Sequence, residues 1–260
     1  HRRELPWRDT SDPYKIWVSE IILQQTRIAQ GISYYFRFIE RFPDVKSLAV
    51  ANEDEVLKYW QGLGYYSRAR NLHASAQTIV NDFNGEFPSD FKQIKSLKGV
   101  GDYTAAAIAS IAFKLPYAVV DGNVYRVLSR LFEINTPIDS VKGKKEFFEL
   151  AQELIDKRTP DLYNQAMMDL GAMVCLPSNP LCMDCPLQLL CQSYHNGSYA
   201  EYPVKEKIIK QRDRYFVYLF LHHQEMIYLH RRSEKEIWAG VYEFPLIELN
   251  APLAEEDVSK

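Results

Sequence analysis

Two carboxylates stand in sequence settings that suit acid catalysis. Glu20 interrupts the apolar run IWVSEIIL, so its side chain either lies on the polar side of a helix or is buried with a raised pKa. Asp121 ends the apolar stretch YAVVD and directly precedes Gly122, where the chain turns into another helix. Two carboxylates in different environments can divide the roles of proton donor and charge stabiliser. The residues alone leave both placements of Glu20 open.

All four cysteines of the chain are clustered in one short segment with the spacing C-x6-C-x2-C-x5-C. They are Cys175, Cys182, Cys185 and Cys191. In a reducing compartment such clustering indicates a bound metal rather than disulfides. Four thiolates suit zinc as well as an iron–sulfur cluster, and spacing does not give the geometry that would distinguish them.

The segment from about 90 to 113, ahead of Asp121, has the features of a phosphate-binding element. Gly99 and Gly101 bracket Val100 in a tight turn, and Asp90 with Ser89 can cap a short helix before it. The small-residue run at 104–109 predicts a second helix that packs closely on a neighbour. Backbone N–H groups at such a hairpin can hold a phosphate oxygen without reading sequence, which indicates DNA.

The pattern L-x-G-V-G followed by V-D-x-N-V-x-R resembles the helix-hairpin-helix DNA glycosylase superfamily. Within it, S-E-I-I-L-Q-Q-T resembles the catalytic helix of the adenine DNA glycosylase (MutY) family. The resemblance implies that Glu20 is the general acid and that Asp121 stabilises, or transiently attacks, the sugar cation. It also implies that Tyr103 and Asn123 orient these groups and the water. The cysteine spacing is that of the superfamily's [4Fe-4S] cluster, which implies this cofactor with a structural and DNA-positioning role.

The same resemblance implies residues that contact the DNA. In the family, the residue matching Tyr65 wedges beside the damaged guanine and the residue matching Gln25 enters the duplex. Further positions that match the substrate pocket are Arg3, Leu5, Trp7, Thr26 and Gln165. In relatives that remove oxidised pyrimidines a lysine stands at the Tyr103 position and forms a Schiff base, so tyrosine there favours a monofunctional enzyme. Tyr125 replaces a lysine that the motif often carries, which puts one phosphate contact in doubt.

Composition describes an ordinary globular chain. It has 260 residues, 47% hydrophobic content and a formal net charge of −3, so DNA binding requires a local basic face rather than bulk charge. No run of eighteen apolar residues and no signal peptide occurs, which predicts a cytoplasmic, nucleoid-associated protein with no membrane partner and a monomeric state. The chain does not begin with Met, and we expect residues before His1.

About ten helices and no strand are expected before residue 210, which gives a mainly α fold. The resemblance implies a helix-hairpin-helix glycosylase domain of two helical lobes over 1–194, with the iron–sulfur loop at 175–191. A polar linker is expected at 195–212. Residues 213–260 predict a β-hairpin around His-His-Gln-Glu, and IWAGVYEFP resembles the start of the MutY C-terminal domain, a smaller Nudix-like α+β recognition module that is incomplete here.

The resemblance to the MutY family implies a base-excision repair enzyme. Its expected reaction is hydrolysis of the N-glycosidic bond of adenine mispaired with 8-oxoguanine or guanine in duplex DNA, after the adenine is flipped out. A bifunctional pyrimidine-lesion glycosylase is disfavoured by Tyr103. A non-catalytic iron–sulfur DNA-binding module is disfavoured by the presence of both Glu20 and Asp121.

Overall fold

The computed structural model describes residues 2–206, 213–233 and 240–252. The chain forms two compact units. One comprises His1–Gly64 and Arg68–Lys207 and contains the helices, and the other comprises Tyr65–Ser67 and Ile208–Lys260.

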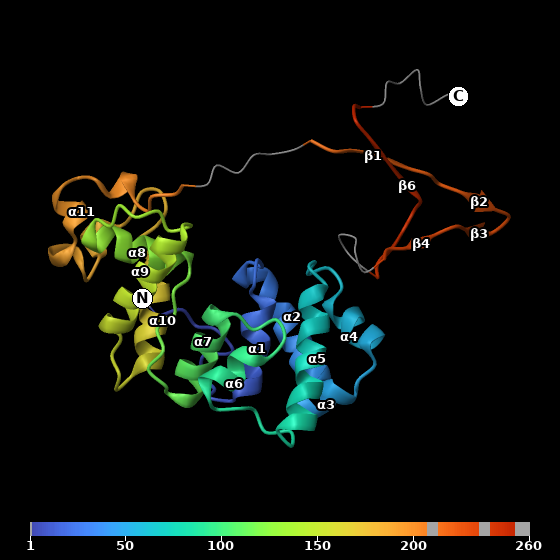
Figure 1. Ribbon diagram of the computed structural model, residues 1–260, viewed down its shortest axis with the longest axis horizontal. Helices are drawn as coiled ribbons and strands as arrows, with labels where there is room; N and C mark the ends of the chain where they lie inside the picture. The colour runs from blue at the N-terminus through green and yellow to red at the C-terminus, as the bar shows by residue number, and fades with distance from the viewer. Residues whose placement is uncertain (1, 207–212, 234–239, 253–260) are drawn as a thin grey trace. The chain divides into compact units, whose positions relative to one another are not determined.

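The predicted mainly α fold is confirmed in the first unit (Figure 1). Its α-helices are α1 (Pro13–Ile22), α2 (Ile28–Arg41), α3 (Val45–Val50), α4 (Glu53–Trp60), α5 (Ser67–Asp82), α6 (Phe91–Ser96), α7 (Asp102–Phe113), α8 (Gly122–Phe132), α9 (Val141–Leu154), α10 (Pro160–Met173) and α11 (Gln192–His195). Three 3-10 turns, η1 (Cys182–Asp184), η2 (Gln188–Leu190) and η3 (Tyr199–Glu201), follow α10. No described helix is long and apolar enough to cross a membrane.

Helix α1 begins where the local sequence predicts. The Asp12 side chain accepts a hydrogen bond from the Tyr14 amide at 2.9 Å, and Pro13 occupies the first helical position. From Ile16 to Ile22 every side chain of the helix is buried. A helix that is apolar on all sides belongs in a core, and α1 packs against both α2 and α7.

The glycine turn at 99–101 forms the expected hairpin between α6 and α7. Asp90 caps α6 by accepting from the amides of Lys92 and Gln93. Gly99 has φ +82°, and a Cβ there would lie 2.8 Å from the Cβ of Asn71, so both the backbone and the space require glycine. Helix α7 then starts at Asp102, with Gly101 as its N-cap.

Helix α7 lies at the centre of the unit, because its small residues let neighbouring helices pack closely around it. Every residue from Thr104 to Ile111 is buried, and α7 packs against α1, α6 and α10. In Figure 1, helices α2 to α5 lie on one side of α1 and α7, while α8 to α11 lie on the other. The expected two lobes are therefore present, and the segments that carry Glu20 and Asp121 come from opposite sides of α7.

The helical unit continues past residue 194, further than expected. Tyr202 is buried, and Arg130 on α8 donates to the carbonyls of Tyr199 and Tyr202 at 2.9 and 3.3 Å. These contacts fix residues 195–206 against α8, because a buried guanidinium needs acceptors and this segment supplies them. The first part of the predicted linker is thus structured, and 207–212 lies outside the described residues.

The described part of the second unit contains short antiparallel strands. Strand β2 (His222–His223) pairs with β3 (Met226–Ile227), which confirms the predicted hairpin turn. Strand β1 (Tyr215–Tyr218) pairs with β6 (Leu246–Leu249), and β4 (His230–Arg231) pairs with β5 (Tyr242–Glu243). Of the IWAGVYEFP motif, residues 237–239 lie outside the described residues.

Candidate active site

A cavity of about 230 Å³ brings the predicted catalytic residues together. Its walls come from the N-terminal segment, α1, α7, the start of α8, and α10. The predicted residues that line it are Arg3, Leu5, Trp7, Glu20, Thr26, Tyr103, Asp121, Asn123 and Gln165. Residues from positions 3 to 165 thus meet at one place, as an enzyme pocket requires.

Glu20 is a buried acid rather than a surface residue. Only 8% of it is exposed, and its neighbours on α1 are fully buried. Burial raises the pKa of Glu20 to about 7, with Asp121 adding to the rise, while a hydrogen bond with Tyr103 and the charge of Arg8 oppose it. A carboxyl group with this pKa retains a large protonated fraction at neutral pH and can donate a proton.

Tyr103, on the first turn of α7, contacts both the acid and the wall of the pocket. Its hydroxyl hydrogen-bonds Glu20 and lies 3.7 Å from the sulfur of Met168. Burial, together with the charges of Glu20 and Asp121, raises the pKa of Tyr103 well above its ordinary value. Tyr103 therefore stays protonated and acts as a hydrogen-bond donor beside Glu20.

Asp121 is held rigidly as the N-cap of α8. Its Oδ1 accepts from the amides of Asn123 and Val124 at 2.9 and 2.8 Å, and its Oδ2 accepts from the Asn123 side chain at 2.8 Å. The start of a helix also carries partial positive charge, which favours an anion. Asp121 is thus held in one orientation, within electrostatic range of Glu20.

The Asn123 side chain is in turn oriented by Arg126. Arg126 Nη2 donates to Asn123 Oδ1 at 2.9 Å and to the Gly171 carbonyl at 2.6 Å. Its Nε donates to the Cys175 carbonyl at 2.7 Å. Gly171 permits this close approach, because a Cβ there would lie 2.9 Å from the Asn123 carbonyl oxygen. Hydrogen bonds therefore connect the Asp121 carboxylate to the first cysteine of the cluster segment.

The sequence analysis missed the residue that holds the N-terminal wall in place. Asp169 on α10 is 5% exposed and accepts hydrogen bonds from Arg3 Nε at 2.5 Å and from Arg8 at 2.5 and 2.8 Å. Burial would raise the pKa of Asp169, but the hydrogen bonds from both arginines outweigh it and lower the pKa. These ion pairs position Leu5 and Trp7, which lie between the arginines in the sequence. No local pattern identifies a pairing across so many residues.

The two predicted duplex-contacting residues are not among the described residues that line this cavity. Gln25 and Tyr65 are both exposed and have positive φ values of 56° and 48°. Arg68 joins the two turns, since its guanidinium donates to the carbonyl of Ile22 at 2.9 Å and to that of Gly64 at 3.2 Å. The buried guanidinium of Arg68 therefore anchors the backbone just before Gln25 and just before Tyr65.

The predicted phosphate-binding glycines occupy the expected hairpin. Gly101 is exposed, and no side chain caps the first turn of α7. The amides at this helix start are thus suited to an anion from outside the chain. The role of Gly99 and Gly101 in DNA binding remains a prediction.

The four cysteines surround one small cavity after α10. Cys175, Cys182, Cys185 and Cys191 all line it, together with Arg130. Burial raises the pKa of Cys182, and the other three cysteines raise it further, which shows that the thiols lie close together. Arg130 donates to Cys175 Sγ at 3.4 Å, so a cationic side chain lies beside the first cysteine. Among the described residues, no three metal-binding side chains converge closely enough to hold one ion.

Comparison with known proteins agrees with the fold and identifies the family. Residues 18–157 match the HhH-GPD superfamily base excision DNA repair protein model. Adenine DNA glycosylase of Buchnera aphidicola subsp. Baizongia pistaciae (strain Bp) is 40% identical over 250 residues, which cover 94% of this chain and 69% of the relative. Adenine DNA glycosylase of Mus musculus is 45% identical over 202 residues, which cover 74% of this chain and 39% of the relative.

Solved structures show the same fold. A thermostable thymine-DNA glycosylase superposes with a TM-score of 0.69 at 32% identity and covers 75% of this chain and 89% of its own. A trapped endonuclease III–DNA covalent intermediate superposes with a TM-score of 0.62 at 25% identity, covering 71% and 85%. A chain with this fold and this pocket is a base-excision DNA glycosylase. Within that class it belongs to the adenine DNA glycosylase family.

Proposed function

We propose that the enzyme removes adenine that is mispaired with 8-oxoguanine or guanine in duplex DNA. The observation that supports this most directly is the buried Glu20 acid facing Asp121 across one cavity. The base must enter that cavity to reach Glu20, so the nucleotide is expected to leave the helical stack before cleavage. The two family relatives above are named for adenine.

The reaction is divided between the two carboxyl groups. Protonated Glu20 donates its proton to the adenine ring, which turns a poor leaving group into a neutral one. Positive charge that develops on the deoxyribose is stabilised by Asp121, which Asn123 and the helix amides keep oriented. Glu20, now a carboxylate, then activates water for attack at the sugar carbon.

We also propose that the enzyme is monofunctional. A Schiff-base mechanism needs an amine that attacks the sugar carbon, and Tyr103 offers a hydroxyl beside Glu20 instead. No lysine lines the catalytic cavity among the residues that the structure describes. We further propose that it acts as a monomer on chromosomal DNA at the nucleoid.

The cysteine segment fits a [4Fe-4S] cluster as its proposed cofactor. All four thiols line one cavity, so one short segment can supply the four cysteine ligands that a [4Fe-4S] cluster requires. Cys175, Cys182, Cys185 and Cys191 would hold the cluster, and Arg130 would balance its thiolate charge. Bound there, the group supplies structural cross-linking of the segment after α10.

Single-turnover excision tests the proposed specificity. Enzyme in excess is mixed with duplexes that contain adenine opposite 8-oxoguanine, guanine or thymine, and a thymine-glycol duplex serves as the control. We expect excision of adenine opposite 8-oxoguanine and opposite guanine. The strand should break at these sites only after alkaline treatment, because a monofunctional enzyme leaves the abasic strand intact. Cleavage of the thymine-glycol duplex without alkali would contradict both parts of the proposal.

A further inference from the structure

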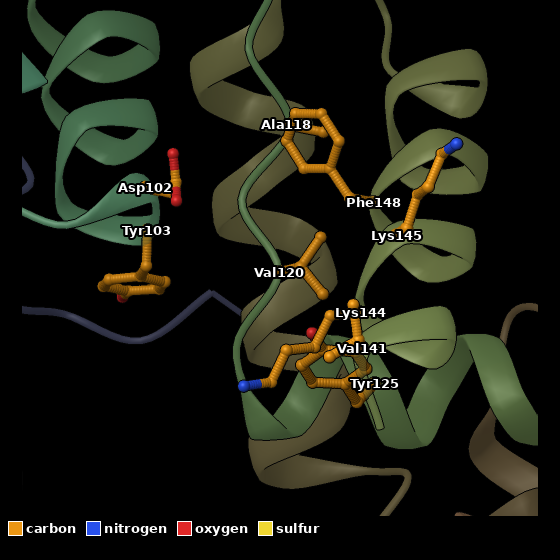
Figure 2. A pocket seen from close by; sticks show the side chains of 9 residues that line it. All are labelled: Asp102, Tyr103, Ala118, Val120, Tyr125, Val141, Lys144, Lys145 and Phe148. Carbon is orange, nitrogen blue, oxygen red and sulfur yellow. The ribbon is translucent and has the colours of Figure 1, made fainter. Parts of the chain in front are cut away.

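A second cavity lies beside the catalytic one and has no role in the chemistry described above (Figure 2). Its volume is about 460 Å³, and it lies between the start of α7, the segment before Asp121, and α9. Lys144, Lys145, Val141 and Phe148 of α9 form one wall, and Tyr103 forms part of the other. We call it the lysine cavity.

The lysine cavity and the catalytic cavity meet at Tyr103, which lines both. A nucleotide in the catalytic cavity remains joined to its neighbours through phosphates on either side. Since Tyr103 is the lining residue that the two cavities share among the described residues, a strand that leaves the catalytic cavity past this ring enters the lysine cavity.

The charge of this cavity suits a phosphate. Lys144 has no ion-pair partner among the described residues, and Lys145 has only an exposed intrahelical contact with Glu149 at 3.8 Å. Asp102, the acid on the opposite wall, is paired with Lys95. In Figure 2 the Lys144 side chain extends from α9 toward the α7 side, whereas that of Lys145 points away. Lys144 is the cation placed to meet an anion in the cavity.

The remaining α9 surface of the cavity is apolar and unusually open. Val141 is 89% exposed and Phe148 is 41% exposed, although both are large hydrophobic residues. A valine and a phenylalanine beside a lysine match the mixed character of a DNA strand, whose apolar sugar carbons alternate with charged phosphates.

We propose that the lysine cavity binds the sugar–phosphate backbone next to the nucleotide in the catalytic cavity. Lys144 Nζ binds the phosphate, and the adjoining deoxyribose packs against Val141 and Phe148. The inference rests on the proposed function, since it requires a DNA strand that enters the catalytic cavity. It assigns a recognition role to α9, which carries none of the catalytic residues.

The test measures binding to a duplex with a tetrahydrofuran abasic site, so it does not depend on which base is excised. Lys144→Gln is compared with Lys142→Gln, an exposed lysine on the same helix turn that does not line the cavity. We expect Lys144→Gln to weaken binding by about tenfold and to reduce the slope of log K against log salt by about 0.9, as for one lost phosphate contact. Lys142→Gln should change neither quantity by a comparable amount.

A methylphosphonate scan locates the contact. Neutralising single phosphates on the abasic strand, one at a time, should weaken parent binding strongly at one position that flanks the abasic site. Lys144→Gln should be insensitive at that position and should respond like the parent elsewhere. The proposal would be overturned if the Lys144 and Lys142 substitutions had equal effects on binding. It would also be overturned if Lys144→Gln lost as much affinity as the parent when each phosphate was neutralised. If the proposed function failed instead, the parent would bind the abasic duplex without excising adenine.

Discussion

Glu20 and Asp121 illustrate how one pocket gives two like side chains different tasks. Glu20 lies on a helix that is buried throughout, so its charged form is penalised and its pKa rises to about 7. Asp121 accepts three hydrogen bonds at a helix start, which fix the orientation of its carboxylate oxygens. The sequence left the placement of Glu20 open, because position on a helix face depends on which neighbours pack there.

Substitution of Glu20 by Gln should remove catalysis and retain DNA binding. Glutamine preserves the shape and hydrogen bonding of the side chain but has no proton to donate, so single-turnover excision should fall by roughly a hundredfold or more. Affinity for a duplex with adenine opposite 8-oxoguanine, measured by fluorescence anisotropy, should stay near the parent value. Excision by Glu20→Gln at a rate close to the parent's would show that another group is the acid.

The raised pKa of Glu20 also predicts that both the excision rate and the stability of the fold decrease as pH rises, each over its own pH range. Above pH 7 the excision rate should fall tenfold per pH unit as Glu20 loses its proton, with binding held saturating. Since the pKa is higher in the folded state, the parent should lose about 3 kcal/mol of stability between pH 4.5 and 7. Glu20→Gln lacks this loss, so its melting temperature relative to the parent should rise over that interval. A pH-independent difference would contradict the burial argument.

At the level of elements, nearby residues determine where helices and turns form, whereas contacts between distant segments determine how these elements pack. The Asp90 cap, the Gly99 turn and the small-residue run of α7 are all determined by nearby residues, and the structure confirms them. Pairing of β1 with β6 and the packing of 195–206 on α8 join distant segments, so no local pattern could predict them. The same limit hid Asp169, whose partners lie at the other end of the chain.

Asp169→Asn should therefore disturb the wall of the catalytic cavity, although Asp169 does not itself line that cavity. Removing the charge leaves Arg3 and Arg8 without their buried anion, which typically costs about 3–5 kcal/mol. We expect a lower melting temperature and a lower excision rate, because Leu5 and Trp7 lose their anchor.

Asp161→Asn is the matched control on the same helix. Asp161 pairs with the exposed Lys114 at 2.5 Å, and such pairs contribute little. Its melting temperature and rate should stay near the parent's. If both variants behaved alike, the N-terminal segment would not depend on the ion pairs of Asp169.

Considered as a whole, the helical unit connects its cysteine segment to its catalytic pocket through α8. Val127 of α8 packs with Leu170 and Val174 in one core cluster, against which Cys175 and Cys185 also pack. Arg126 and Arg130, one turn apart on the same helix, bind the segment through the Cys175 carbonyl and sulfur. Loss of order in the segment should consequently reach Asn123 and Asp121.

Cys182→Ser tests the proposed cofactor and this connection together. We expect the parent, prepared anaerobically, to be brown with broad visible absorbance and about four irons per chain. Cys182→Ser should lose iron, melt at a lower temperature and excise adenine more slowly, because the metal and the fold of its binding segment are coupled.

Ser178→Ala changes an exposed residue of the same segment and should keep the iron and the rate. Parent protein with stoichiometric zinc and no iron would exclude the cluster, whereas iron loss with an unchanged excision rate would show that α8 keeps the pocket in order without the segment.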